Sequence, residues 1–211
     1  SNSPLDLPIT EERLREPISI ILRDYPEHKC NIYLLHGDMT ENEMTGLYNH
    51  PKIKALINLA HGEGFGLPTF EAAYNELPVV TPSWGGQNDF LYVPTKDKKK
   101  KKIYNKAHFA KVDFLIQPVQ DEAVWGIPDK GPVLIKDSMW CFPHEGSYKK
   151  AIRDVYKNYG KYKKMARLLK EHVVENFTEE KQYKKFADAI YTEDTSEIAD
   201  WLDGLDIKEF A

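Results

Sequence analysis

The chain has 211 residues, of which 41% are hydrophobic and 29% charged, and its formal net charge is −4. This is the composition of an ordinary globular protein. No run approaches the roughly eighteen apolar residues of a membrane span, and no signal peptide is visible. The two cysteines, Cys30 and Cys141, lack metal-ligand spacing, so we expect a cytoplasmic protein with reduced thiols and no membrane span.

The first third of the chain contains three predicted elements. Thr10-Glu11-Glu12 resembles a helix start, and Pro17 is expected to break or restart the helix that follows. The apolar run at 31–36 predicts a buried strand. Thr40-x-x-Glu43 has the spacing of a capping box, which predicts a helix near 41–49.

A strand, a glycine loop, a helix and a second strand then follow in close succession. The apolar runs at 55–60 and 78–81 predict the two strands, and Val112–Gln117 predicts a further one. Pro68 suits the first turn of a helix, which we expect to run from Leu67 to about Asn75. This order is typical of an open parallel sheet, which binds ligands at the carboxyl ends of its strands.

The residues at this helix start suit a ligand that is both anionic and rich in hydroxyl groups. Gly64 and Gly66 allow a close approach of the backbone, and the free N–H groups of the first turn favour an anion. The carboxylates of Glu63 and Glu71 can each accept hydrogen bonds from neighbouring hydroxyls. A nucleoside diphosphate sugar has these features, with Glu63 meeting the hexose and Glu71 the ribose. The simpler alternative is a purely structural glycine turn, with glutamates that only favour the helix dipole.

The segment Glu63-Gly-Phe-Gly-Leu-Pro-x-x-Glu71-Ala-Ala, followed by Leu77-Pro-Val-Val, resembles the E-x7-E segment of retaining glycosyltransferases. It is most similar to family GT4, which has the two-domain GT-B architecture. The resemblance covers roughly residues 28–95 well and 137–190 more loosely. It implies an α/β fold, namely a three-layer Rossmann-like parallel sheet forming an incomplete GT-B C-terminal domain, with extra C-terminal helices.

The resemblance also implies the roles of single residues. Glu63 and Glu71 are the expected catalytic pair. Expected contacts to the donor are Gly64, Phe65, Gly66, Leu67, Gly37, Asp38, Met39 and His61. Expected contacts to the sugar or the acceptor are Trp84, Gly85, Gly86 and Gln87. No metal and no cofactor are implied beyond the nucleotide sugar, which is the donor substrate.

The chain departs from the family pattern in three places. Glu76 stands where the family has a helix-ending glycine, so either Glu76 or Asn75 must supply a left-handed residue. Asp89 stands where the family has a longer acid. The Arg and Lys that clamp the diphosphate are not found, and we expect the N-terminal acceptor-binding domain to be missing, which would leave this fragment alone inactive.

The rest of the chain predicts appendages to this domain. The lysine-rich stretch at 96–102 predicts a solvated loop, and residues 147–191 predict helices. We expect a nucleotide-sugar-binding domain at 1–191 and an acidic tail at 192–211 with an apolar stripe, formed by Ile198, Trp201, Leu202 and Leu205.

The predicted function is transfer of a hexose from a nucleotide sugar to an unknown glycan or other acceptor, with retention of configuration. Two alternatives stay open. The chain is an isolated nucleotide-sugar-binding module without activity, or it belongs to a transferase that modifies nucleic acid and grips it with the lysine-rich loop. No nucleic-acid motif supports the second alternative.

Overall fold

The computed structural model describes residues 11–97, 102–127, 131–135 and 137–190. It separates into two units, residues 1–44 and 45–211. The predicted acidic tail, the start of the first helix at Thr10 and the centre of the lysine-rich loop lie outside the described residues.

The first unit begins with helix α1 (Glu11–Asp24), which continues through Pro17. The predicted break at Pro17 is therefore wrong. A proline removes one backbone hydrogen bond and bends a helix, but the bonds on either side of it can carry the helix onward.

Residues 31–36 form no strand, so this prediction is also wrong. Ile32, Tyr33 and Leu35 are 51%, 86% and 62% exposed. A strand is stabilised by the backbone hydrogen bonds of a neighbouring strand, and this segment has none within its unit.

Helix α2 (Glu41–Tyr48) confirms the predicted capping box. The backbone N–H of Thr40 donates to Glu43 Oε2 at 2.8 Å, and the N–H of Glu43 donates to Thr40 Oγ1 at 3.3 Å. The Thr40 N–H and the Thr40 hydroxyl both donate to the Glu43 carboxylate and lower its pKa, with the backbone donor as the main cause.

The second unit is built on a small parallel sheet, so the α/β class is confirmed. Strands β1 (Leu56–Ile57), β2 (Val79–Pro82) and β5 (Ala110–Val112) lie in the order β1-β2-β5. Both strands predicted at 55–60 and 78–81 are present, although the first is short. All four residues of the central strand β2 are buried, as expected for a strand covered on both faces.

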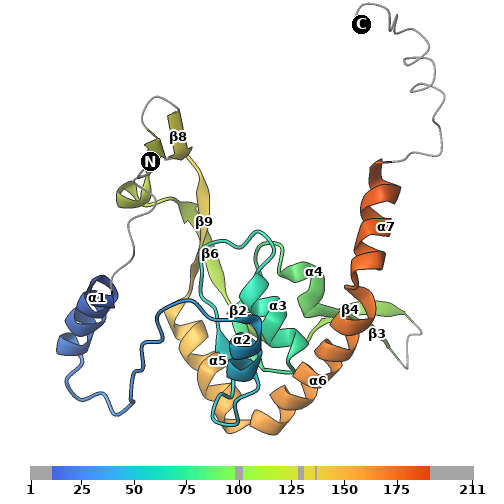
Figure 1. Ribbon diagram of the computed structural model, residues 1–211, viewed down its shortest axis with the longest axis horizontal. Helices are drawn as coiled ribbons and strands as arrows, with labels where there is room; N and C mark the ends of the chain where they lie inside the picture. Colours follow the sequence, from blue (N-terminus) through green and yellow to red (C-terminus); the bar gives the residue numbers. More distant parts are fainter. Residues whose placement is uncertain (1–10, 98–101, 128–130, 136, 191–211) are drawn as a thin grey trace, which may run out of the picture. The chain divides into compact units, whose positions relative to one another are not determined.

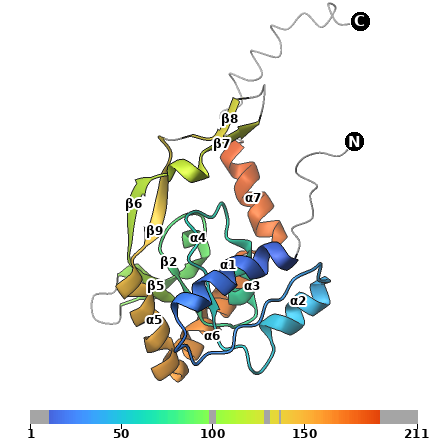
Figure 2. The same cartoon turned by 90° about the vertical axis from the view of Figure 1, so that its left-hand side faces the viewer.

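Helices cover the two faces of this sheet. Helices α3 (Leu67–Tyr74) and α5 (Glu145–Lys157) lie on opposite sides of β2 and β5 (Figure 2). On the α5 side, Val80 and Val112 pack against Val155 and against Tyr162 of α6 (Tyr159–Asn176). Thr69, Ala72 and Ala73 are the fully buried residues of α3.

The segment 112–117 is not one strand, which corrects the prediction. The chain turns at Asp113, whose N–H donates to Ser147 Oγ at 2.9 Å and whose carbonyl accepts from the His144 N–H at 2.7 Å. Strand β6 (Phe114–Pro118) then pairs antiparallel with β9 (Met139–Pro143). Figure 1 shows these two strands extending side by side away from the sheet. We call them the arm.

Smaller elements complete the arm and the connections. A 3-10 turn (Asp121–Ala123) and strands β7 (Trp125–Ile127) and β8 (Gly131–Leu134) lie between β6 and β9. Helix α4 (Asn88–Leu91) leads into the hairpin of β3 (Tyr92–Lys96) and β4 (Ile103–Ala107). The lysine-rich loop connects these two strands, and residues 98–101 of it are outside the described part.

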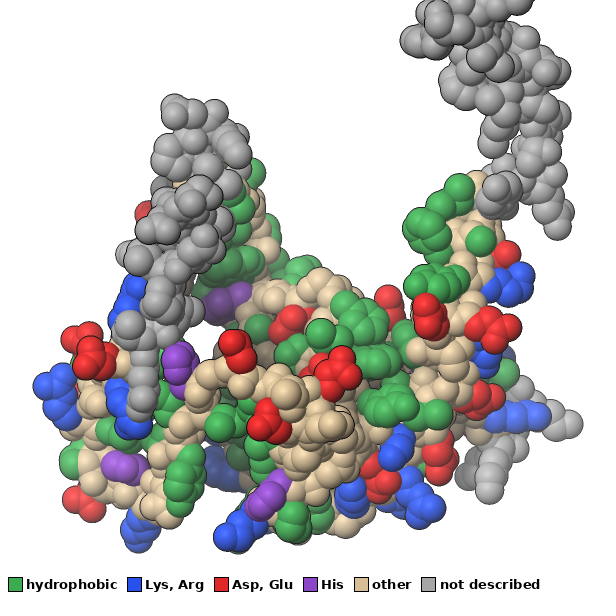
Figure 3. Space-filling view, in the orientation of Figure 1, with side chains coloured by type: hydrophobic (Ala, Val, Ile, Leu, Met, Phe, Trp, Pro, Cys, Tyr) green, Lys and Arg blue, Asp and Glu red, His purple; other side chains and the backbone are tan. Residues whose placement is uncertain are grey.

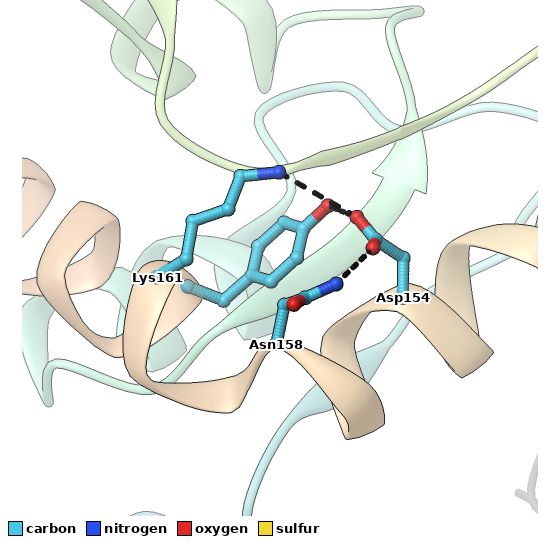
Figure 4. Close-up of polar contacts among 4 residues, drawn as sticks. Asp154, Asn158 and Lys161 are labelled. Atoms are coloured by element: carbon cyan, nitrogen blue, oxygen red, sulfur yellow. Dashed lines mark hydrogen bonds and ion pairs between the residues drawn. The ribbon is translucent and has the colours of Figure 1, made fainter.

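Three helices end the described chain, as predicted. The corner between α5 and α6 is fixed by Asp154, which accepts hydrogen bonds from Tyr162 Oη and, at 2.6 Å, from Asn158 Nδ2 (Figure 4). Lys161 Nζ lies 3.6 Å from the same carboxylate. These contacts lower the pKa of Asp154, with the Tyr162 bond as the main cause.

Helix α7 (Glu179–Ile190) carries an exposed apolar stripe. Tyr183, Phe186 and Ile190 are 65%, 68% and 58% exposed. Figure 3 shows hydrophobic side chains gathered along α7. Within the described ranges, no helix combines the length and the apolar character needed to cross a membrane.

Candidate functional site

The candidate site is formed by the loops that follow β1 and β2. Both loops leave the carboxyl ends of parallel strands, so they meet at the same edge of the sheet, where open α/β sheets bind ligands. Their contact is direct, because the N–H of Gly86 donates to the carbonyl of Glu63 at 3.2 Å. The expected residues from His61 to Gln87 are therefore brought together at one edge.

Helix α3 begins in this site with an open N-terminus. Gly66 precedes it in the left-handed region at φ 84°, and Pro68 lies in its first turn. No side chain of the described residues caps this end. The N–H groups of the first turn that lack a partner can bind an anion, and the helix dipole favours one.

Glu63 is held by Asn58, a residue that the sequence analysis did not single out. Asn58 Nδ2 donates to Glu63 Oε1 at 2.9 Å and to Thr69 Oγ1, in the first turn of α3, at 3.3 Å. The second carboxylate oxygen of Glu63 can still accept from a ligand. The signal that could have identified Asn58 is its place as the one polar residue in the apolar run 55–60.

Glu71 lies beside Tyr48, a second residue that spacing along the sequence does not identify as part of the site. Tyr48 is 8% exposed, and its hydroxyl donates to the carbonyl of Pro68 at 3.4 Å and interacts with the Glu71 carboxylate. Burial, followed by the bond to Glu71 and the charge of Glu71, raises the pKa of Tyr48 to about 12. Tyr48 is therefore a neutral hydrogen-bond donor at neutral pH.

The glycines of the second loop lie close against the backbone of the first loop. A Cβ on Gly86 would lie 1.9 Å from the carbonyl oxygen of Gly64, and a Cβ on Gly85 would lie 2.6 Å from that of Glu63. Gly85 also has a φ of 79°. A Cβ on Gly64, in contrast, would have no neighbour within 4 Å. Of the glycines in the two loops that were expected to contact ligand, Gly64 is the one whose surroundings are open.

Gln87 lies beneath both loops and is 3% exposed. Its Nε2 donates to Thr81 Oγ1 and to the Pro82 carbonyl, both at 2.9 Å, and lies 3.1 Å from the Trp84 carbonyl. These acceptors fix the orientation of the amide. The buried Oε1 atom accepts no hydrogen bond from the described residues. It lies beside Gly66, since a Cβ there would be 3.4 Å from it.

His61 joins the site to the arm. Its Nδ1 donates to the Cys141 carbonyl at 2.7 Å, and its own carbonyl accepts from the Cys141 N–H at 3.0 Å. The imidazole stacks on Trp140, with ring centroids 4.9 Å apart, and lies 4.6 Å from the ring of Phe142. These contacts give His61 a structural role at the base of the arm, two residues from Glu63.

Trp84 and Phe65 also lie at this edge with part of their surface exposed. Trp84 is 37% exposed, and its ring centroid is 5.8 Å from that of Phe114, at the start of the arm. Phe65 is 43% exposed and contacts Phe70 and Phe90 at 5.1 and 5.2 Å. Both rings are anchored on one side and available to a ligand on the other.

The remaining expected residues are placed as follows. Leu67 is 58% exposed at the start of α3. Gly37, Asp38 and Met39 belong to the first unit. Gly37 has a φ of 124°, and Asp38 is exposed.

Five cavities of about 180 to 730 Å³ lie on the second unit, and neither Glu63 nor Glu71 lines any of these five. Tyr48 lines the smallest of them. Among the described residues, no group of three His, Cys, Asp or Glu side chains is placed to hold a metal ion.

Comparisons with known proteins add no assignment. No protein-family model matches the chain, and neither the curated proteins nor the solved structures contain a match.

Proposed function

We propose that this chain carries the donor-binding half of a retaining glycosyltransferase and binds a nucleoside diphosphate sugar at the start of α3. In this proposal the sheet is the core of a Rossmann-like GT-B domain. The acceptor is bound by a further domain, and the sugar is transferred with retention of configuration.

One observation carries the proposal: an uncapped helix N-terminus lies between two glutamates, of which Glu63 accepts a hydrogen bond from Asn58 and Glu71 lies beside the hydroxyl of Tyr48. The helix end suits the diphosphate, because its free N–H groups and its dipole stabilise negative charge. In the transfer step this is the charge that develops on the departing diphosphate. The free carboxylate oxygens of Glu63 and Glu71 suit the hydroxyls of the hexose and the ribose.

Gln87 supports the same ligand class. Its buried Oε1 needs a donor, and it lies at the beginning of α3 beside Gly66. A hydroxyl group can donate to Oε1 while it accepts from a nearby N–H. A polyol attached to an anion satisfies both kinds of group at this helix end.

Calorimetric titration of the chain with UDP-glucose, GDP-mannose and ADP-glucose tests the proposal. We expect one of them to bind, and we expect Glu63→Gln and Glu71→Gln each to weaken binding by about tenfold, because a hydrogen bond to a charged group contributes ~1.5–3 kcal/mol. Glu76→Gln is the matched control, since Glu76 pairs with Lys163 away from the site. Wild-type affinity in both site variants, or no binding of any donor, would contradict the proposal.

A transfer assay distinguishes the transferase from a module that only binds. In an intact enzyme that contains this domain, Glu63→Ala and Glu71→Ala should each reduce transfer by about 100-fold if they contact the transition state. Binding by this chain, with transfer unaffected by either substitution, would assign the site a role in binding alone.

A further inference from the structure

The backbone N–H and both side-chain amide groups of Asn58 have hydrogen-bond partners. Its N–H donates to the Val80 carbonyl at 3.0 Å, so its backbone belongs to the sheet at the end of β1. Its Oδ1 accepts from the Ala60 N–H at 3.0 Å. Because Oδ1 is fixed by this donor, Nδ2 must face Glu63 and Thr69.

This arrangement sets the position of the Glu63 carboxylate relative to both the sheet and α3. Thr69 is fully buried, so the Asn58 amide lies between a fixed helix and a fixed strand. Glu63 Oε1 is then held by a rigid donor. Its second oxygen is directed by that bond rather than by free rotation of a long side chain.

Glu71 is supported from a different direction. Residues 69 and 71 differ by about 200° around a helix, so the side chain of Glu71 leaves α3 on a different side from that of Thr69. There it meets the hydroxyl of the buried Tyr48. Asn58 and Tyr48 therefore support the two glutamates separately.

We propose that Asn58 is the positioning residue for recognition of the donor sugar through Glu63, and that Tyr48 is the positioning residue for recognition of the ribose through Glu71. The inference rests on the proposed function and adds that the affinities for the two halves of the ligand are separable. Asn58 contributes to binding of the sugar and not of the bare nucleotide. Tyr48 contributes to binding of both, because both contain the ribose.

Asn58→Asp is the decisive variant. Aspartate keeps the oxygen that accepts from Ala60 and nearly the same volume, but it loses both N–H donors and places a negative charge against Glu63. We expect the affinity for the nucleotide sugar to fall about tenfold, as for loss of a charge-assisted hydrogen bond, while that for the matching nucleoside diphosphate stays within about twofold.

The pH dependence of this variant supplies a readout that a purely structural residue would not give. Two adjacent carboxylates raise the pKa of one of them, and the protonated acid can again donate to its neighbour. Lowering the pH to about 5 should therefore restore part of the affinity for the nucleotide sugar in Asn58→Asp, and should not increase it in the wild-type chain.

Tyr48→Phe and two further variants complete the test. We expect Tyr48→Phe to lower the affinity for the nucleotide sugar and the affinity for the bare nucleotide by the same factor. Asn158→Asp is the matched control, because Asn158 Nδ2 also donates to a carboxylate, Asp154 Oδ1 at 2.6 Å, but at the corner between α5 and α6, and we expect it to change neither affinity. If Asn58→Asp does not fold, Asn58→Ser replaces it, since a serine hydroxyl can accept from Ala60 but is too short to reach Glu63.

Each outcome is decisive. If the wild-type chain binds none of UDP, GDP, ADP and their sugars, the proposed function fails. Suppose instead that the wild-type chain binds, but that the Asn58 variant lowers the affinities for sugar nucleotide and bare nucleotide equally, or lowers neither affinity. In both cases the proposed function stands and the positioning role of Asn58 is overturned.

Discussion

Glu76 occupies a backbone conformation that favours glycine. Its φ is 59°, whereas Asn75 has a φ of −91°, so the left-handed residue that ends α3 is the glutamate and not the asparagine. A residue with a Cβ is strained there by about 1 kcal/mol. Lys163 offsets part of this strain, since its Nζ lies 3.2 Å from Glu76 Oε1 and donates to the Glu76 carbonyl at 2.8 Å.

Substitutions at Glu76 should separate the strain from the ion pair. Glu76→Ala loses the ion pair and keeps the strain, whereas Glu76→Gly loses both. We therefore expect the free energy of unfolding of Glu76→Gly to exceed that of Glu76→Ala by about 1 kcal/mol, measured by urea denaturation. Equal stability of the two variants would show that position 76 is not strained.

At the scale of the elements, the two site loops behave as one packed layer. The loop after β2 lies directly on the backbone of residues 63–65, and the Gln87 amide ties it to β2. Such backbone-to-backbone packing leaves no space for a side chain between the loops.

Gly86→Ala should therefore separate the loops. The new Cβ would lie 1.9 Å from the Gly64 carbonyl oxygen, so we expect a loss of about 1–3 kcal/mol in the free energy of unfolding. Gly64→Ala is the control, because its Cβ meets nothing within 4 Å, and it should cost less than about 1 kcal/mol. Urea denaturation of the two variants measures the difference, and equal losses would rule out the close packing.

The elements that the sequence predicts correctly are those with local determinants. The capping box of α2 and the proline at the start of α3 act within one turn, so four residues are enough to recognise them. Whether residues 31–36 and 112–117 form strands depends on a partner strand lying alongside them. The local sequence carries no information about that partner. The pairing of β6 with β9 joins segments about twenty residues apart and leaves no periodic signal.

The candidate site follows the same division. The glutamates and glycines could be predicted, because their spacing along one loop and helix is itself the signal. Asn58 and Tyr48 could not be assigned from spacing, since each reaches its glutamate through the fold. The packing role of Gly85 and Gly86 could not be predicted, because a glycine needed for loop packing looks the same in sequence as one needed for binding.

For the molecule as a whole, two buried tyrosines predict a loss of stability in alkali. Burial, and then hydrogen bonds to Glu71 and Asp154, raise the pKa of Tyr48 and Tyr162 from 10.0 to about 12. In the unfolded chain both ionise near pH 10, and in the folded chain they stay protonated. Their contribution is therefore complete below pH 10 and is lost as the pH rises towards 12.

Tyr162→Phe should reduce this alkaline loss. We expect the free energy of unfolding of the wild-type chain to fall between about pH 10 and pH 12, and to fall less steeply in Tyr162→Phe, because one of the two linked ionisations is removed. Tyr156→Phe is the control, since Tyr156 is 86% exposed and should leave the curve unchanged. Parallel curves for wild type and Tyr162→Phe would contradict the prediction.

The bridge between His61 and Cys141 has a mechanical consequence. The imidazole and the carbonyl of His61 both hydrogen-bond to Cys141 of β9. This strand and the loop that carries Glu63 are therefore mechanically coupled. A molecule that binds the outer part of the arm would act on β9, and the His61–Cys141 bonds at its base lie two residues from Glu63. Any movement of β9 at this point would therefore be transmitted to the backbone of the loop that carries Glu63.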